Sequence, residues 1–80
     1  MKPSEQMLLG CGFKYEPAFS ENHETYTRSA ENGWEELCFF DTDRTYTFSY
    51  ENELYCFPAH IDMDVAAAIH QHLLELGWIK

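Results

Sequence analysis

Carboxylates dominate the side chains of this sequence that can do chemistry. Its 80 residues hold fourteen Asp and Glu against five Lys and Arg, for a formal net charge of −9 with the four His neutral. Carboxylates that converge can act as an acid–base pair or hold a metal ion, whereas carboxylates spread over a surface attract cations. Glu35 and Glu36 are adjacent in an expected strand and point to opposite faces, so they form no catalytic pair by themselves.

Candidate metal ligands lack a recognised spacing. Asp41-x-Asp43 resembles a metal-binding D-x-D, but the Gly and the downstream Glu of a calcium loop are missing, which favours a plain acidic turn. His70 and His72 would point roughly 200° apart on a helix, so they cannot share an ion.

Cysteine and histidine could also form a nucleophilic site. No local signature joins any pair of them, and Cys38 and Cys56 fall in expected strands with aromatic neighbours, as small buried side chains do. A metal set of Cys56, His60 and Asp62 is conceivable, but a polar helix cap with surface histidines is the simpler interpretation. The sequence therefore predicts no metal, no cofactor and no enzymatic activity.

The acid is concentrated in the middle of the chain. Residues 16–64 hold twelve acids and two bases, for a net charge of −10, which exceeds what solubility requires. Such a surface repels nucleic acid and anionic membranes and favours basic protein partners. We therefore expect a non-enzymatic interaction protein that binds a basic surface of another protein and blocks the nucleic acid that this surface otherwise holds. The residues expected to bind the partner are Glu35, Glu36, Asp41, Asp43, Glu51 and Glu53.

Aromatic and basic residues suggest two other functions. A protein that sequesters a nucleotide signal would stack bases on exposed aromatics and hold phosphates with arginines, with an oligomer bringing copies of the few cations together. The residues for this site are Trp34, Tyr46, Tyr50, Arg28 and Arg44. The third hypothesis is a structural or regulatory subunit that forms a homodimer through aromatic residues on a second face of the sheet. The aromatics expected there are Tyr26, Trp34, Phe40 and Tyr55.

A sheet must position these residues. Alternating apolar and polar residues predict antiparallel strands at about residues 13–19, 24–28, 34–40, 45–50 and 54–57, with turns at about 20–23 and 41–44. Asn32-Gly33 is a strong hairpin signal, and Pro17 indicates an edge strand or a bulge. The third strand would place Leu37 and Phe39 on one face, with Glu36, Cys38 and Phe40 on the other.

A helix is expected on each side of these strands in the sequence. Pro3 starts a short helix that Gly10 ends, and Asp62 can cap a longer, amphipathic helix that ends at Gly77. This order predicts a single α+β domain over residues 1–80. It would be an antiparallel β-meander of four to five strands with the short N-terminal and longer C-terminal helix packed on one face.

Composition and targeting signals indicate the compartment. Apolar residues make up 45% and aromatics 16% of the chain, enough for a small core. No segment resembles a signal peptide, and no apolar run approaches the ~20 residues that span a bilayer. Three cysteines without a C-x-x-C are typical of reduced thiols. We expect a cytoplasmic protein that binds no membrane.

Three features resemble small accessory proteins encoded by phages and prophages of Gram-positive bacteria. The opening helix ends in Gly-Phe at residues 7–13, a Phe-Asp turn occupies 39–43, and the last helix closes on Leu-Gly-Trp-Ile at 76–79. The pattern covers most of the chain, although Cys11 and Gly12 depart from a simpler Leu-Gly-Phe form. Members of this class with an assigned activity commonly counter host defences, by occluding a nuclease complex or by sequestering a nucleotide signal. The resemblance implies a function of this kind and supplies no site residues.

Overall fold

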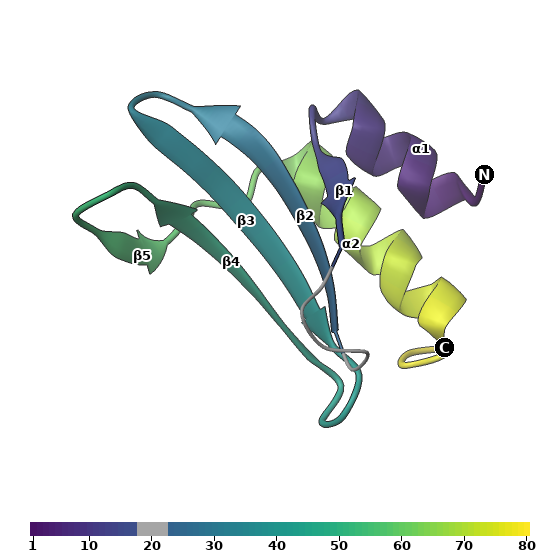
Figure 1. Ribbon diagram of the computed structural model, residues 1–80. Coiled ribbons are helices and arrows are strands. Elements are labelled where there is room, and N and C mark those ends of the chain that lie inside the picture. The colour runs from purple at the N-terminus through teal and green to yellow at the C-terminus, as the bar shows by residue number, and fades with distance from the viewer. Residues whose placement is uncertain (18–22) are drawn as a thin grey trace. The chain divides into compact units, whose positions relative to one another are not determined.

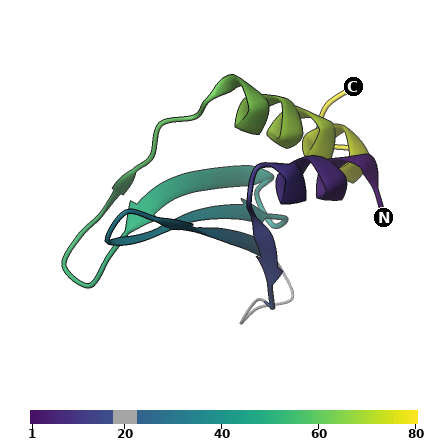
Figure 2. The same ribbon diagram turned by 90° about the horizontal axis from the view of Figure 1, so that it is seen from above.

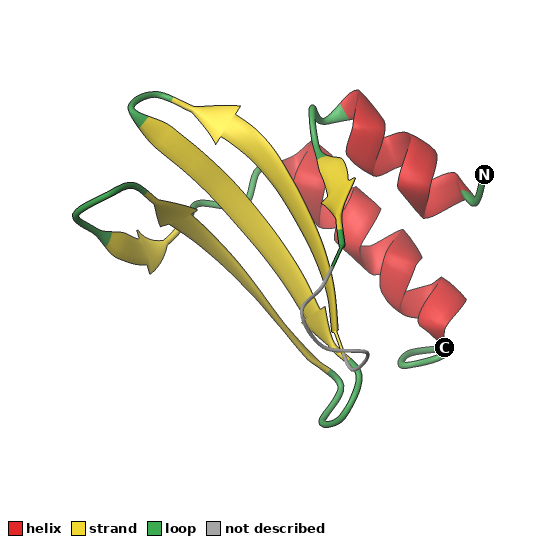
Figure 3. Ribbon diagram, in the orientation of Figure 1, coloured by secondary structure: helices red, strands yellow, loops and turns green. Residues whose placement is uncertain are grey.

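The described chain is an α+β structure with an antiparallel meander and two helices (Figures 1 and 3). The computed structural model describes residues 1–17 and 23–80. They form two compact units, Lys14–His60 and Met1–Phe13 with Ile61–Lys80. The end of the strand expected at 13–19 and most of the turn expected at 20–23 lie outside the described residues.

The unit Lys14–His60 contains the sheet. Its described strands are β1 (Lys14–Glu16), β2 (His23–Ala30), β3 (Gly33–Phe40), β4 (Thr45–Glu51) and β5 (Cys56–Pro58). Each strand pairs antiparallel with the next, so the expected meander is confirmed. Phe13 was expected in the first strand, but it precedes β1, and its N–H donates to the Leu8 carbonyl at 3.0 Å.

Side chains on β2, β3 and β4 alternate between two faces. Tyr26, Leu37 and Phe48 are direct cross-strand partners. All three are buried, as is Phe39, and we call their side of the sheet the core face. The expectation that Leu37 and Phe39 share a face is confirmed. The expectation that Tyr26 lies on the opposite face is wrong, because cross-strand partners point to the same side and its partner is Leu37.

The β2–β3 hairpin places its glycine in the strand rather than in the turn. Ala30 pairs directly with Gly33, so the loop consists of Glu31 and Asn32. Asn32 adopts the left-handed conformation with a φ of 60°, which asparagine tolerates. At Gly33 a Cβ atom would overlap the backbone carbonyl of Glu51. Glycine is therefore required by the close approach of β4.

Asn52 organises the β4–β5 loop. Its Oδ1 accepts hydrogen bonds from the N–H groups of Leu54 at 2.8 Å and Tyr55 at 2.7 Å, and its own N–H donates to the Tyr55 carbonyl at 2.9 Å. This side-chain turn competes with strand pairing. As a result β5 starts only at Cys56, and the expected strand over residues 54–57 is wrong in its first half.

The second unit contains the helices α1 (Pro3–Gly10) and α2 (Met63–Leu76), which lie side by side (Figure 2). The Asp62 carboxylate accepts a hydrogen bond from the N–H of Val65 at 2.9 Å. Gly77 ends α2 in the left-handed conformation with a φ of 77°, so both expected caps are confirmed. Neither of these described helices has the length and apolar run that a membrane crossing needs.

A polar cluster that no sequence pattern indicated joins α1 to α2. The Ser4 hydroxyl donates to Glu75 Oε1 at 2.6 Å and lies 3.0 Å from His72 Nδ1, and the Ser4 N–H donates to Glu75 Oε2 at 2.9 Å. Ser4 and His72 are buried. Burial alone would raise the pKa of Glu75, but hydrogen bonds from Ser4 and Gln71 lower it below its ordinary value. Glu75 therefore places a carboxylate at the N-terminus of α1, where the helix dipole favours negative charge.

Ser4→Ala is expected to destabilise the protein by about 1–3 kcal/mol, because it removes the donor of a short hydrogen bond to a carboxylate. Urea unfolding at neutral pH measures the loss, with the exposed Ser29→Ala as a control that should change little. The stability gained through Glu75 is full above its ordinary pKa of 4.5 and disappears as the pH falls through the lowered pKa. The free energies of unfolding of the wild type and of Ser4→Ala should therefore become equal at acid pH. Equal stability of wild type and Ser4→Ala at neutral pH would contradict this account of the cluster.

Candidate functional site

The side of the sheet opposite the core face is polar and partly exposed. Its side chains come from β2, β3 and β4 in register, and we call it the polar face. On these strands it consists of His23, Thr25, Thr27, Ser29, Trp34, Glu36, Cys38, Phe40, Thr45, Thr47, Ser49 and Glu51, and the edge strands extend it with Lys14, Glu16, Cys56 and Pro58. Apart from the buried Thr25, all of these residues remain accessible to solvent. The polar face can therefore contact a ligand directly.

Two of the expected carboxylates, Glu36 and Glu51, converge on the polar face. Trp34 lies directly across from Glu51, and Glu36 directly across from Ser49, so the two glutamates are diagonal neighbours. A hydrogen bond to Glu51, burial and the charge of Glu51 together raise the pKa of Glu36 to about 7. Glu51 Oε2 is buried and accepts no hydrogen bond from any described residue. The pair therefore holds a proton near neutral pH.

Glu36→Gln is expected to stabilise the protein by about 1 kcal/mol at about pH 8, after allowance for solvent screening at this half-exposed site. The folded-state pKa of about 7 lies above the ordinary 4.5. Protonated Glu36 therefore stabilises the fold fully below the ordinary value, and this contribution is lost as the pH rises through about 7. Gln cannot ionise and keeps a donor for Glu51.

Thermal unfolding at about pH 8 and about pH 4 measures this effect. Glu53→Gln removes the same charge from an exposed loop and serves as the control. The gain in Tm for Glu36→Gln should appear at the higher pH alone. A Glu36→Gln protein no more stable than Glu53→Gln at about pH 8 would show that the pair is not under repulsion.

Cys38 lies beside the pair, in surroundings that disfavour a nucleophile. Burial raises the pKa of the Cys38 thiol, and the charges of Glu36 and Glu51 raise it further, against hydrogen bonds to Thr25 and Thr47 that lower it. A thiol of raised pKa supplies little thiolate. Within residues 1–17 and 23–80, no group of three or more His, Cys, Asp or Glu side chains could hold a metal ion.

The other four carboxylates expected to bind a partner lie elsewhere. Glu35 is on the core face, where its Oε1 accepts a hydrogen bond from Arg28 Nε at 2.6 Å. Asp41 and Asp43 are exposed in the β3–β4 turn, and Glu53 is exposed in the β4–β5 loop at the opposite end of the sheet. Of the six expected carboxylates, Glu36 and Glu51 alone lie next to each other on one face of the sheet. The sequence could not show this, because strand register determines which side chains become neighbours.

The residues expected to hold a nucleotide are not brought together in one copy. Arg28 is held in its ion pair near the start of β3, whereas Arg44 lies in the turn beyond the end of β3. The strand alone separates them by on the order of 16 Å. Trp34 is on the polar face, and Tyr46 and Tyr50 point to the opposite side of the sheet. A nucleotide site built from these five residues needs more than one copy.

Comparisons with protein-family models, with curated protein sequences and with solved structures return no match for this chain. The candidate site is therefore defined by the chain's own geometry, the carboxyl pair Glu36–Glu51 beside Trp34.

Proposed function

We propose that this protein is a small, acidic, non-enzymatic binding protein that docks its polar face on a basic surface of another protein. The observation that carries the proposal is the convergence of Glu36 and Glu51 beside the exposed Trp34. A hydrogen bond to Glu51, burial and the negative charge of Glu51 raise the pKa of Glu36, so two ionised carboxylates at this place repel each other. A Lys or Arg side chain would relieve that repulsion, so the pair favours a cationic ligand.

The wider distribution of charge supports a protein partner. The segment 16–64 carries a net charge of −10, and Asp41, Asp43 and Glu53 are exposed at the two ends of the sheet. These acids attract a basic partner over a long range and raise the association rate. They do not contact the Lys or Arg side chain that Glu36 and Glu51 would bind. The same charge repels nucleic acid and anionic membranes.

A basic surface that otherwise holds nucleic acid fits this pattern, because carboxylates can occupy the Lys and Arg sites that phosphates use. The resemblance to phage accessory proteins supports a partner of this class, a host defence protein in the cytoplasm. The chain would block the nucleic-acid site of that protein by occupying it.

The salt dependence of binding to a basic ligand tests the proposal. The probe is a short synthetic peptide rich in Lys and Arg, and a peptide of the same length rich in Ser and Gly is its control. We expect the Kd of the basic peptide to rise at least about tenfold between about 50 mM and about 300 mM NaCl, because salt screens exposed charges. A Kd that does not respond to salt, or equal binding of the control peptide, would overturn the proposal.

A further inference from the structure

An apolar pocket lies at the end of the sheet where the β2–β3 and β4–β5 loops meet. Its volume is about 460 Å³, and its lining residues are Asn32, Gly33, Trp34, Asn52, Glu53 and Leu54. Large apolar side chains are exposed at this end of the sheet: 82% for Leu54, 63% for Tyr55 and 39% for Trp34. We call these three residues the loop-end patch.

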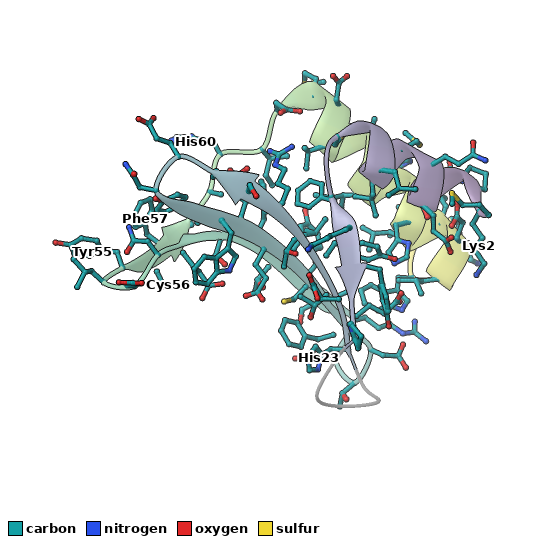
Figure 4. The ribbon with its side chains drawn as sticks, turned by 45° about the horizontal axis from the view of Figure 1, so that its top comes forward. Lys2, His23, Tyr55, Cys56, Phe57 and His60 are labelled. Carbon is teal, nitrogen blue, oxygen red and sulfur yellow. The ribbon has the colours of Figure 1, made fainter. Side chains whose placement is uncertain are left out.

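The loop-end patch is concentrated at one end of the sheet. Figure 4 shows Tyr55 there, with His23 at the opposite end. Phe57 pairs with Tyr50, with 5.0 Å between the ring centroids, so Phe57 lies on the face opposite Trp34 and outside the patch. Single exposed apolar residues are ordinary on protein surfaces, but a group of them beside a pocket marks an interaction site.

Hydrogen bonds hold this pocket in shape. The Tyr50 hydroxyl donates to the backbone carbonyl of Glu31 at 2.7 Å, and Asn52 Nδ2 lies 3.5 Å from the same hydroxyl. Tyr50 therefore connects the β2–β3 loop to the β4–β5 loop. A pocket that is already formed loses less conformational entropy when a ligand binds.

The charge around the loop-end patch is acidic. Glu53 lines the pocket, Glu31 is exposed in the neighbouring loop, and Glu51 lies directly across from Trp34. Arg28 lies near this end of the sheet but is held in an ion pair with Glu35, and Arg44 lies in the turn at the other end. A cationic ligand is therefore complementary to this end.

We infer that the loop-end patch receives a Lys or Arg side chain of the partner protein together with an adjoining aliphatic or aromatic residue. The cation lies over the Trp34 ring between Glu51 and Glu53, and the apolar residue covers Leu54. This inference rests on the proposed function and specifies its ligand as a basic segment with an apolar neighbour. A second copy of the chain fits poorly, because a two-fold contact would bring the same glutamates face to face.

Two peptides of equal positive charge test the inference. In one, the Lys and Arg residues are flanked by Leu and Phe; in the other, they are flanked by Ser and Gly. We expect the apolar-flanked peptide to bind about tenfold more tightly and to shift the backbone amide NMR signals of Trp34 and Leu54. Leu54→Ser should remove most of that preference, because it deletes the exposed leucine side chain that a flanking Leu or Phe of the peptide would cover. Met63→Ser is the matched control, because Met63 is 83% exposed in the other unit, and it should leave both affinities unchanged.

The outcomes separate this inference from the proposed function. If both peptides bind equally well and Leu54→Ser changes nothing, the loop-end patch is not the site, while the acidic binding function stands. If neither peptide binds, the proposed function fails and the inference fails with it. If the free protein is a dimer that Leu54→Ser dissociates, the patch is a contact between copies and the inference is overturned.

Discussion

Replacing Glu36 and Glu51 together by Gln is expected to weaken binding of the basic peptide by about 30-fold. The two glutamates converge on the polar face, where a Lys or Arg side chain would contact both. Each charge-assisted contact at a half-exposed site contributes about 1 kcal/mol, and two such contacts correspond to about this change in Kd. Isothermal titration calorimetry at low salt measures the loss. The double variant should fold, because Gln preserves the shape of both side chains.

The matched control for this result is Asp41→Asn combined with Asp43→Asn. It also replaces two carboxylates by amides, in the exposed β3–β4 turn. Because that turn lies at the other end of the sheet from Trp34, we expect a loss of about twofold, mostly in the association rate. Equal losses from the two double variants would mean that the basic ligand responds to overall charge alone, and Glu36 and Glu51 would not be its site.

Gly33→Ala is expected to destabilise the protein by about 1–3 kcal/mol, the range for a side chain forced into a packed site. An added Cβ would overlap the Glu51 carbonyl oxygen and lie 2.9 Å from the Tyr50 hydroxyl. Backbone at one of these strands must move, which disturbs the pairing of Trp34 with Glu51. Urea unfolding monitored by circular dichroism measures the change, and binding of the basic peptide should weaken in parallel.

Gly10→Ala is the control for that experiment. Gly10 is the last residue of α1, and a Cβ there meets no described atom within 4 Å. Since Ala favours helix over Gly, this variant should be neutral or more stable by up to about 1 kcal/mol. A Gly33→Ala protein as stable as Gly10→Ala would contradict the close approach of β3 and β4 on which the loop-end pocket depends.

Local patterns predicted much of the fold. Alternation in β3 assigned Leu37 and Phe39 to one face, and the caps at Asp62 and Gly77 were recognised because capping depends on a few neighbouring residues. The error at Tyr26 has a physical origin. Its face depends on register with β3, and the hairpin loop begins one residue earlier than Asn32-Gly33 indicated.

The functional residues were harder to predict, because their chemistry depends on partners distant in sequence. Glu35 and Glu36 are adjacent residues of the same type. Cross-strand register nevertheless places Glu35 beside Arg28 and Glu36 beside Glu51. Ser4 and Glu75 are separated by most of the chain, and no periodicity brings them together. Acid content thus predicted the type of ligand, while register selected the two residues that converge.

The central claim is that a partner's cation replaces the proton held by Glu36 and Glu51, and the number of protons released on binding tests it most directly. With a pKa of about 7 for Glu36, about half of the molecules hold that proton at neutral pH. Calorimetric titration with the basic peptide, repeated in buffers of different ionisation enthalpy, counts the protons. We predict release of about half a proton per complex for the wild type and none for Glu36→Gln. A wild-type complex that forms without proton release would contradict the claim.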